Sequence, residues 1–447
     1  MQAVSTFSIW RLTWPTMLSN MFFMLVGIAF LKIAANLGTD EVAAATTGQR
    51  LLFVVQAITL GLCSGTTAMV GKYWGAGDKK MAGHCAALSL LIFSFAGLLL
   101  SWLPIPWLQQ IIGLFGLSTK AQALAVDFTF WTAVFAPPML SSLILGMSFR
   151  AIGDSFTPLW ISIISSCSAI VLASALTLGW GGLPTYQLSG LAIGGGIAFA
   201  ISTLLFTLLW IFGLLSFKPH NPLTSFKIHG KKLVDIGAPA AFEQAVFQVG
   251  VIVFLAFLTS YGNEAFAAYG IGLSILGLII VMAFSFSMSS ATLVSQYLGA
   301  GDHQGAYRAG WRTMRTCVYF MLIGGLIMAL TAEQIARFMS DDEAVIEHMI
   351  TLTYILSLSL PLMGIEFSMA GALRGAGDTR FPMLVTLFSM LLSRIFIPWL
   401  LVEMGAEVVW LYAISILDFA IKASLNMVRF RSKTWMKLDR QIPATHN

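Results

Sequence analysis

Apolar residues along this chain fall into twelve long stretches, and the short polar segments between them contain most of the charged residues. Each stretch is longer than the roughly 20 residues with which an α-helix crosses the hydrocarbon core of a bilayer. We therefore predict an all-α fold, a polytopic membrane bundle of twelve transmembrane helices. The expected spans are residues 13–35, 43–70, 83–105, 121–147, 156–178, 187–215, 236–260, 266–296, 308–331, 345–371, 381–402 and 408–430.

The composition supports a membrane protein and argues against several other classes. Hydrophobic residues make up 57% of the 447 residues and charged residues 10%, against about 25% charged residues in soluble domains. The net charge of +5 does not indicate nucleic-acid binding, because the basic residues lie in short loops rather than on one face. The four cysteines show no CxxC or Cys/His spacing, so we expect no disulfide, metal centre or cofactor.

The basic residues also predict an orientation in the membrane. With the N-terminus inside, nineteen of the 25 Lys and Arg residues lie on the cytoplasmic side, as the positive-inside rule requires. We therefore expect both termini in the cytoplasm. The longest polar connector lies midway along the chain and separates two lobes, and a polar tail follows the second lobe. We therefore expect four parts. These are an N-terminal lobe at 1–215, a cytoplasmic linker at 216–235, a C-terminal lobe at 236–432 and a cytoplasmic tail at 433–447.

An internal repeat with an offset of 224 residues relates the two halves. Six spans in each half preserve the orientation, so we predict two pseudo-symmetric six-helix lobes related by an axis along the membrane normal. The matched segments are Val70–Asp78 with Val294–Asp302, Phe149–Pro158 with Leu373–Pro382, Pro15 with Pro239, and Pro137 with Pro361.

The longer matched segments contain glycine-rich turns on the cytoplasmic side. Glycine permits the left-handed conformation that ends a helix, and the following aspartate can cap the next helix. We interpret these turns as capping and loop-pinning motifs rather than substrate contacts. The GxGD pattern also occurs in intramembrane aspartyl proteases, but here it falls in turns and never in a span. The motif residues are Gly75, Gly77, Asp78, Arg150, Asp154, Gly299, Gly301, Asp302, Arg374 and Asp378.

At these residues the chain resembles the bacterial branch of the multidrug and toxic compound extrusion (MATE) family over nearly its whole length. The resemblance also includes the opening of the seventh helix at Pro239–Gln244 and the segment Arg429–Trp435. It implies a two-lobed antiporter that exports amphipathic, often cationic drugs or metabolites in exchange for H⁺ or Na⁺. We expect a monomer in the bacterial inner membrane, with no enzymatic activity, no cofactor and no nucleic-acid partner.

Charged side chains at bilayer depth are costly, so each one needs a partner or a function. Glu243 lies one turn after Pro239, which frees backbone carbonyls near the carboxylate. It therefore fits a site for H⁺ or Na⁺, and the alternative is an ion pair with a structural arginine. Gln244 and Gln248 lie one turn apart, and Asn20 is the repeat equivalent of Gln244, so these amides are candidates to line a cavity.

Further intramembrane charges lie in the second half. Glu366 either binds ion or substrate or pairs with Arg374. The resemblance places a carboxylate of some relatives about one turn from Glu366, so the match is to a region. Arg394 resembles a common family arginine, and we expect it to hold a carboxylate. Asp418 and Lys422 are four residues apart on one helix face and can neutralise each other, or Asp418 can bind a proton.

Lys32 stands where many relatives carry an aspartate, which puts an ion site in the first lobe in doubt. It could pair with Asp127 or extend to the outer headgroups. We therefore predict that coupling depends on the second lobe, with Glu243 first and then Glu366 and Asp418. The alternatives are a flippase for lipid-linked precursors, which would need a strongly cationic cavity, and a membrane enzyme, for which the sequence has no catalytic motif.

Overall fold

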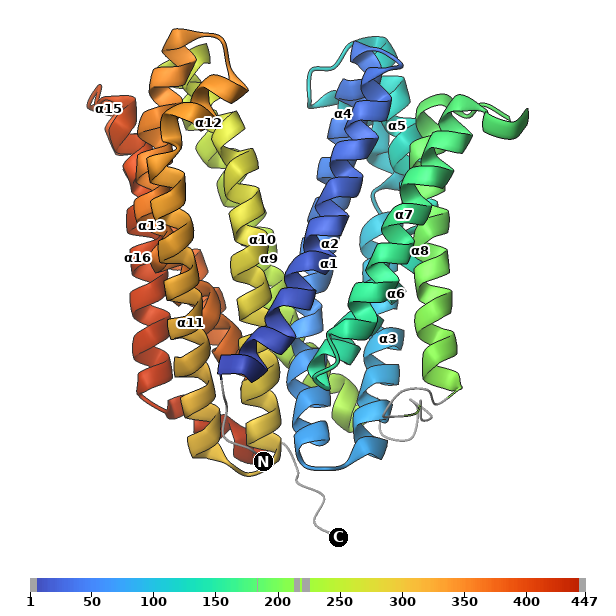
Figure 1. Cartoon of the computed structure of the whole chain (residues 1–447), viewed down its shortest axis with the longest axis vertical. Helices are drawn as coiled ribbons and strands as arrows, with labels where there is room; N and C mark the ends of the chain where they lie inside the picture. The colour runs from blue at the N-terminus through green and yellow to red at the C-terminus, as the bar shows by residue number, and fades with distance from the viewer. Residues whose placement is uncertain (1–5, 183, 213–217, 219–225, 442–447) are drawn as a thin grey trace. The chain divides into compact units, whose positions relative to one another are not determined.

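The protein is a bundle of α-helices, as the apolar stretches predicted (Figure 1). The computed structural model describes residues 6–182, 184–212, 218 and 226–441, and these residues contain no β-strand. The chain forms two compact units. One comprises Trp14–Gly237, and the other combines Met1–Thr13 with Ala238–Asn447.

The first unit is built from the helices of the first half of the chain. The predicted linker at 216–235 lies partly outside the described residues, but residues 226–235 are helical and residues up to Gly237 belong to this unit. The elements are α1 (Thr6–Ala35), α2 (Thr39–Gly75), α3 (Lys79–Trp102), η1 (Ile105–Trp107), α4 (Leu108–Gly113), α5 (Thr119–Val134), α6 (Ala136–Ala151), α7 (Phe156–Leu178), η2 (Trp180–Gly182), α8 (Gln187–Ile211) and η3 (Phe226–Gly230).

The second unit repeats this plan with different helix breaks. The predicted tail at 433–447 is described as far as residue 441, where it forms a short helix. The elements are α9 (Lys231–Leu258), η4 (Thr259–Tyr261), α10 (Asn263–Gly299), α11 (His303–Leu330), α12 (Ala332–Met339), α13 (Glu343–Gly375), α14 (Arg380–Met390), η5 (Leu391–Phe396), α15 (Ile397–Glu403), α16 (Val408–Arg431) and η6 (Thr434–Gln441).

The prediction of twelve spans is confirmed with one correction. Eleven helices within the described residues are long and apolar enough to cross a membrane, and the pair α5 and α6 makes the twelfth candidate. The expected span 121–147 is not one helix, because α5 and α6 meet at a bend of 54°. Pro137 and Pro138 follow the bend, and each removes a backbone donor and disfavours helical geometry in the residue before it. The equivalent Pro361 is followed by Leu362 and lies inside continuous α13.

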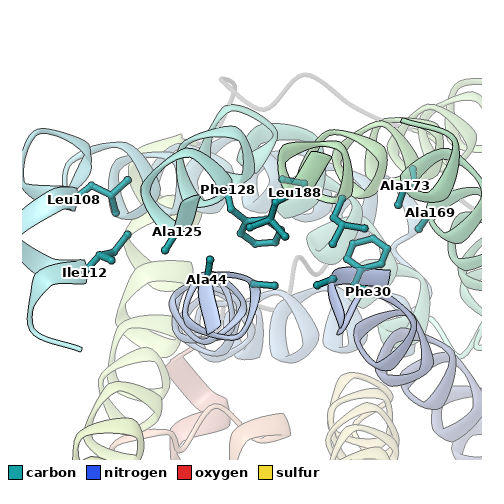
Figure 2. Close-up of a cluster of buried hydrophobic side chains, with 14 residues drawn as sticks. Phe30, Ala44, Leu108, Ile112, Ala125, Phe128, Ala169, Ala173 and Leu188 are labelled. Atoms are coloured by element: carbon teal, nitrogen blue, oxygen red, sulfur yellow. The ribbon is translucent and has the colours of Figure 1, made fainter. Parts of the chain in front are cut away.

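Small residues allow the helices of the first unit to pack closely. Figure 2 shows part of the buried apolar cluster, in which Phe30, Ala44, Phe128 and Ala173 are contributed by α1, α2, α5 and α7. A Cβ atom added to Gly48 would lie 2.3 Å from the ring of Phe128. Since apolar side chains gain little by leaving lipid for a helix interface, such close contact is a main source of helix association.

The same principle governs α10 and α13 in the second unit. A Cβ atom on Gly371 would lie 2.3 Å from the backbone oxygen of Ser287, and one on Gly375 would lie 2.3 Å from that of Ala291. Both contacts are with main-chain atoms, which cannot rotate away. The two helices can therefore approach this closely only where α13 carries glycine.

Four turns end their helices with the same hydrogen-bond pattern. Gly77, Gly153, Gly301 and Gly377 have φ angles of 82°, 93°, 74° and 85°, a left-handed geometry that glycine adopts without strain. In each turn the following aspartate N–H donates to the carbonyl five residues earlier, over 2.9–3.0 Å. These helices therefore end in Schellman-type caps, and the repeat seen in the sequence is a repeat of backbone geometry.

The turn aspartates have two different roles. Asp78 accepts a hydrogen bond from the N–H of Met81 over 2.8 Å, and Asp302 accepts one from Gly305 over 2.6 Å. Asp154 accepts from the N–H of Thr157 over 3.0 Å. Each of these three carboxylates caps the following helix. Asp378 instead accepts from Nε of Arg429 over 2.8 Å, so it ties the turn after α13 to the end of α16.

The close approach of α10 and α13 can be tested at Gly371. We expect Gly371→Ala to destabilise the protein by about 1–3 kcal/mol, because the new methyl group would displace backbone. Gly324→Ala is the matched control, since a Cβ at Gly324 meets nothing within 4 Å. Thermal unfolding of the purified proteins in detergent measures the difference. Equal melting temperatures for the two variants would contradict the packing argument.

Candidate functional site

A cluster of six acidic and basic side chains lies in the interior of the second unit, among the residues that the structure describes. They are contributed by α9, α13, η5 and α16, and five of them are buried, while the Arg374 side chain is 11% exposed. A charge in this environment must be paired or neutralised to be tolerated. The six side chains are Glu243, Glu366, Arg374, Arg394, Asp418 and Lys422.

The carboxylate of Asp418 is held by four neighbours. Lys422 Nζ lies 3.1 Å from it and Arg394 Nη2 lies 3.5 Å from it. The hydroxyl groups of Ser389 and Ser393 donate to Oδ1 over 2.5 and 3.1 Å. Both oxygens of Asp418 are therefore occupied, which is the arrangement of a fixed internal ion pair.

The π-helical turn η5 positions two of these partners. It comprises Leu391–Phe396 and carries both Ser393 and Arg394. Such turns widen a helix locally and are frequent at functional sites. The Arg394 guanidinium also lies 4.6 Å from the ring centroid of Phe254, and its Nη1 donates to the hydroxyl of Tyr269 over 3.4 Å. Arg394 therefore holds a carboxylate, as we expected, and is itself held from two sides.

Glu243 forms the second buried ion pair. Its Oε1 accepts from Nη2 of Arg374 over 2.6 Å and from the hydroxyl of Thr386 over 3.1 Å. The structure thus shows the arginine pair that was the alternative interpretation of this residue. Its Oε2 has no hydrogen-bond partner among the described residues. A cation site at Glu243 stays a prediction, and it would have to use this second oxygen.

Glu366 is the third buried carboxylate, and it is arranged differently. It is 7% exposed, and no ion pair within 4.0 Å involves it in the described part of the chain. The expected pair with Arg374 is absent among the described residues because that arginine binds Glu243 instead. Oε2 of Glu366 is buried and has no hydrogen-bond partner there. An ionised oxygen in that position is costly, whereas a bound proton or cation would satisfy it.

The remaining candidates take no part in the ion pairs and hydrogen bonds described above for these carboxylates. Gln244 and Gln248 are half-buried on α9. Asn20 is half-buried on α1 and belongs to the other unit. Lys32 and Asp127 are both exposed, and among the described residues no ion pair joins them. Asp127 accepts a hydrogen bond from Ser189 instead.

Sequence analysis missed the polar residues that complete the site. Thr386, Ser389 and Ser393 all donate to the buried carboxylates. Ser389 and Ser393 are four residues apart and Ser393 directly precedes Arg394, so their shared helix face was a usable signal. Asn426 was missed as well. It is 1% exposed, and its Oδ1 has no hydrogen-bond partner among the described residues.

Comparison with known proteins agrees with the repeat and with the fold. A model of the MatE family matches residues 15–175 and 239–400, two segments that begin 224 residues apart. The chain is 26% identical over 437 residues to a probable multidrug resistance protein NorM of Thermotoga maritima, covering 96% of this chain and 92% of that one. It is 23% identical over 366 residues to an FAD transporter of Shewanella oneidensis, covering 80% of each chain.

A solved structure has the same fold. The structure of a MOP superfamily transporter from Pyrococcus furiosus matches this chain with a TM-score of 0.88. The match covers 97% of this chain and 96% of that one at 17% sequence identity. At this identity the likeness concerns the arrangement of the helices and leaves the chemistry of the site to be argued from its own residues.

The Glu243–Arg374 pair predicts a specific pattern of stability. We expect Glu243→Gln to destabilise the protein by about 3–5 kcal/mol, because it leaves the Arg374 charge buried without its partner. The double variant Glu243→Gln/Arg374→Gln should recover much of this loss, because neither charge remains. Thermal unfolding in detergent measures both variants.

Arg337→Gln provides the control for this test. Arg337 lies in an exposed ion pair with Glu333 and Glu343, and exposed pairs contribute little to stability. The melting temperature of Arg337→Gln should equal that of the wild-type protein. A double variant less stable than Glu243→Gln alone would contradict the argument that an unpaired buried charge causes the loss.

Proposed function

Because this chain belongs to the MatE family and is similar to the probable multidrug resistance protein NorM described above, we propose that it is a secondary active multidrug exporter. It moves amphipathic, often cationic small molecules out of the cell in exchange for H⁺ or Na⁺, by alternating access. We further propose that the second unit couples the two movements through Glu366.

The state of Glu366 carries this proposal. Asp418 and Glu243 both have basic partners within 3.5 Å, so their charges are already compensated. Glu366 has no such partner among the described residues and has a buried oxygen without a hydrogen bond. A coupling group must gain and lose a cation during each cycle. Of the three carboxylates, Glu366 is the one that can do so without first breaking an ion pair.

The charge balance of the site supports a coupling role. When all are ionised, the three carboxylates of the site and its three basic residues Arg374, Arg394 and Lys422 have no net formal charge. A cation bound at Glu366 therefore changes this balanced interior to a net positive one. Charge in a medium of low polarity interacts strongly with its surroundings. Binding and release can thus shift the equilibrium between two conformations that differ in access.

The remaining parts of the proposal follow from the sequence. We place the exporter in the bacterial inner membrane with both termini in the cytoplasm, on the basis of its basic loops. The exporter acts as a monomer on drugs or metabolites, and uses no cofactor and no nucleic-acid partner. A lipid flippase is less well supported, because Arg394 and Lys422, which could bind a lipid phosphate, both hold Asp418.

Transport by inverted membrane vesicles tests this function. We expect vesicles with the protein to take up ethidium or norfloxacin when a pH gradient or a Na⁺ gradient is imposed, and vesicles without it not to do so. Glu366→Gln should reduce gradient-driven uptake to the level of empty vesicles while ethidium still binds the purified protein. The glutamine side chain has nearly the same size as glutamate, but it has no negative charge and so cannot bind and release a cation as the carboxylate does.

Glu347→Gln is the matched control for this variant. Glu347 lies on the same helix, α13, but is exposed, so its neutralisation should leave uptake unchanged. Normal gradient-driven uptake by Glu366→Gln would show that the coupling group lies elsewhere. Uptake that neither gradient stimulates in the wild type would contradict antiport itself.

A further inference from the structure

The internal repeat shows which residue faces Glu366. The offset of 224 residues relates Glu366 to Ser142 and Asn426 to Ser202. In the first unit, the hydroxyl groups of Ser142 on α6 and Ser202 on α8 are 2.6 Å apart and buried. In the second unit, α13 and α16 pack against each other as α6 and α8 do. The repeat therefore brings the Glu366 and Asn426 positions face to face.

The pattern of residues on α16 supports this orientation independently. Asp418, Lys422 and Asn426 follow one another at intervals of four residues, which places them on one helix face. Asp418 and Lys422 point into the buried polar network. Asn426 continues the same face by one more turn, and it is 1% exposed.

Replacing two serines by a glutamate and an asparagine changes the chemistry between the helices. Two hydroxyl groups can satisfy each other, because each can donate and accept. Glu366 Oε2 and Asn426 Oδ1 are both acceptors, and each is buried without a hydrogen-bond partner among the described residues. If the repeat sets these two acceptor oxygens opposite each other, as it sets the two serine hydroxyls of the first unit, a proton between them would satisfy both.

We propose that Asn426 completes the coupling site, and that the coupling ion is a proton carried by Glu366 and donated in a hydrogen bond to Asn426 Oδ1. This inference rests on the proposed function, which it deepens by naming a second residue and the ion. A hard metal cation takes about six oxygen ligands, whereas this pair supplies two. A proton needs one donor oxygen and one acceptor oxygen, which is what the pair provides.

Other charged groups set the background in which Glu366 titrates. The charged groups that share this buried site with Glu366 are Glu243, Arg374, Asp418 and Lys422. The thiol of Cys317, on the neighbouring helix α11, is a further titratable group buried in this unit. The four charges have fixed partners in the ion pairs described above. Asn426 is neutral and acts through a hydrogen bond, so its removal should change proton affinity without changing the charge of the site.

Infrared difference spectroscopy of the purified protein tests this proposal by following the C=O stretch of the protonated carboxyl group through a pH titration. The band of Glu366 is identified by its loss in Glu366→Gln. In Asn426→Leu we expect this band to move to higher frequency, because the carboxyl group loses its acceptor. A lost hydrogen bond to the protonated form also weakens proton binding, so the midpoint should fall by about one pH unit.

Ser202→Ala is the matched control, because it removes the equivalent contact in the first unit and should change neither the band nor its midpoint. An unchanged band and midpoint in Asn426→Leu would overturn the proposal, as would a Glu366 band that Na⁺ removes at constant pH. The titration needs no transport. If neither gradient drives uptake but the band responds as expected, the proposed function fails while the assignment of the proton site stands.

Discussion

A charge inside a membrane protein must be compensated, and this constraint organises the interior of the second unit. An isolated charged residue at the bilayer centre costs ~2.5–3.5 kcal/mol even on insertion scales. Asp418 meets the constraint with Lys422 and Arg394, and Glu243 meets it with Arg374. These two ion pairs leave Glu366 as a buried carboxylate without a direct basic partner in the part of the chain that the structure describes. The interior thus contains two kinds of acidic group among the described residues, those in direct ion pairs and one outside any direct ion pair, which is the one that we propose changes state.

The two halves share their backbone geometry, but their polar residues at equivalent positions differ. Their turns have the same left-handed glycines and the same hydrogen bonds, so the duplicated sequence preserves how each helix ends. The positions of Glu243, Glu366 and Asp418 are occupied in the first half by Ser19, Ser142 and Gly194. The same helical scaffold therefore has neutral residues at these positions in the first half and charged residues in the second. The contact between Ser142 and Ser202 in the first half indicates which positions of the second half are neighbours.

Much of the fold could be predicted from the sequence, because hydrophobicity and length determine where a chain can cross a bilayer. The turns were also predictable, because a glycine followed by an aspartate at a fixed spacing is typical of a helix end followed by a capped helix. The break between α5 and α6 was not predicted, because Pro137 matches Pro361 and the sequence alone did not show that Pro138 would decide the outcome. The spacing of Asp418 and Lys422 did indicate their pair, but the sequence did not show which partners Glu243 and Glu366 would have. Arg374 is close in sequence to Glu366 but binds Glu243, and such a choice depends on how each helix is rotated about its axis.

The break at Phe135 has a structural consequence. The bend divides this span into two short helices with different neighbours, since α5 packs mainly against α2 and α8, and α6 packs against α2, α3 and α8. In the second half α13 is continuous through the equivalent point, so one helix joins its two ends. Glu366 and Arg374 lie on this helix, eight residues apart. If Glu366 changes state as proposed, α13 is a continuous helix between that carboxylate and the turn that Arg429 holds through Asp378, whereas the bend between α5 and α6 interrupts the equivalent helix of the first half.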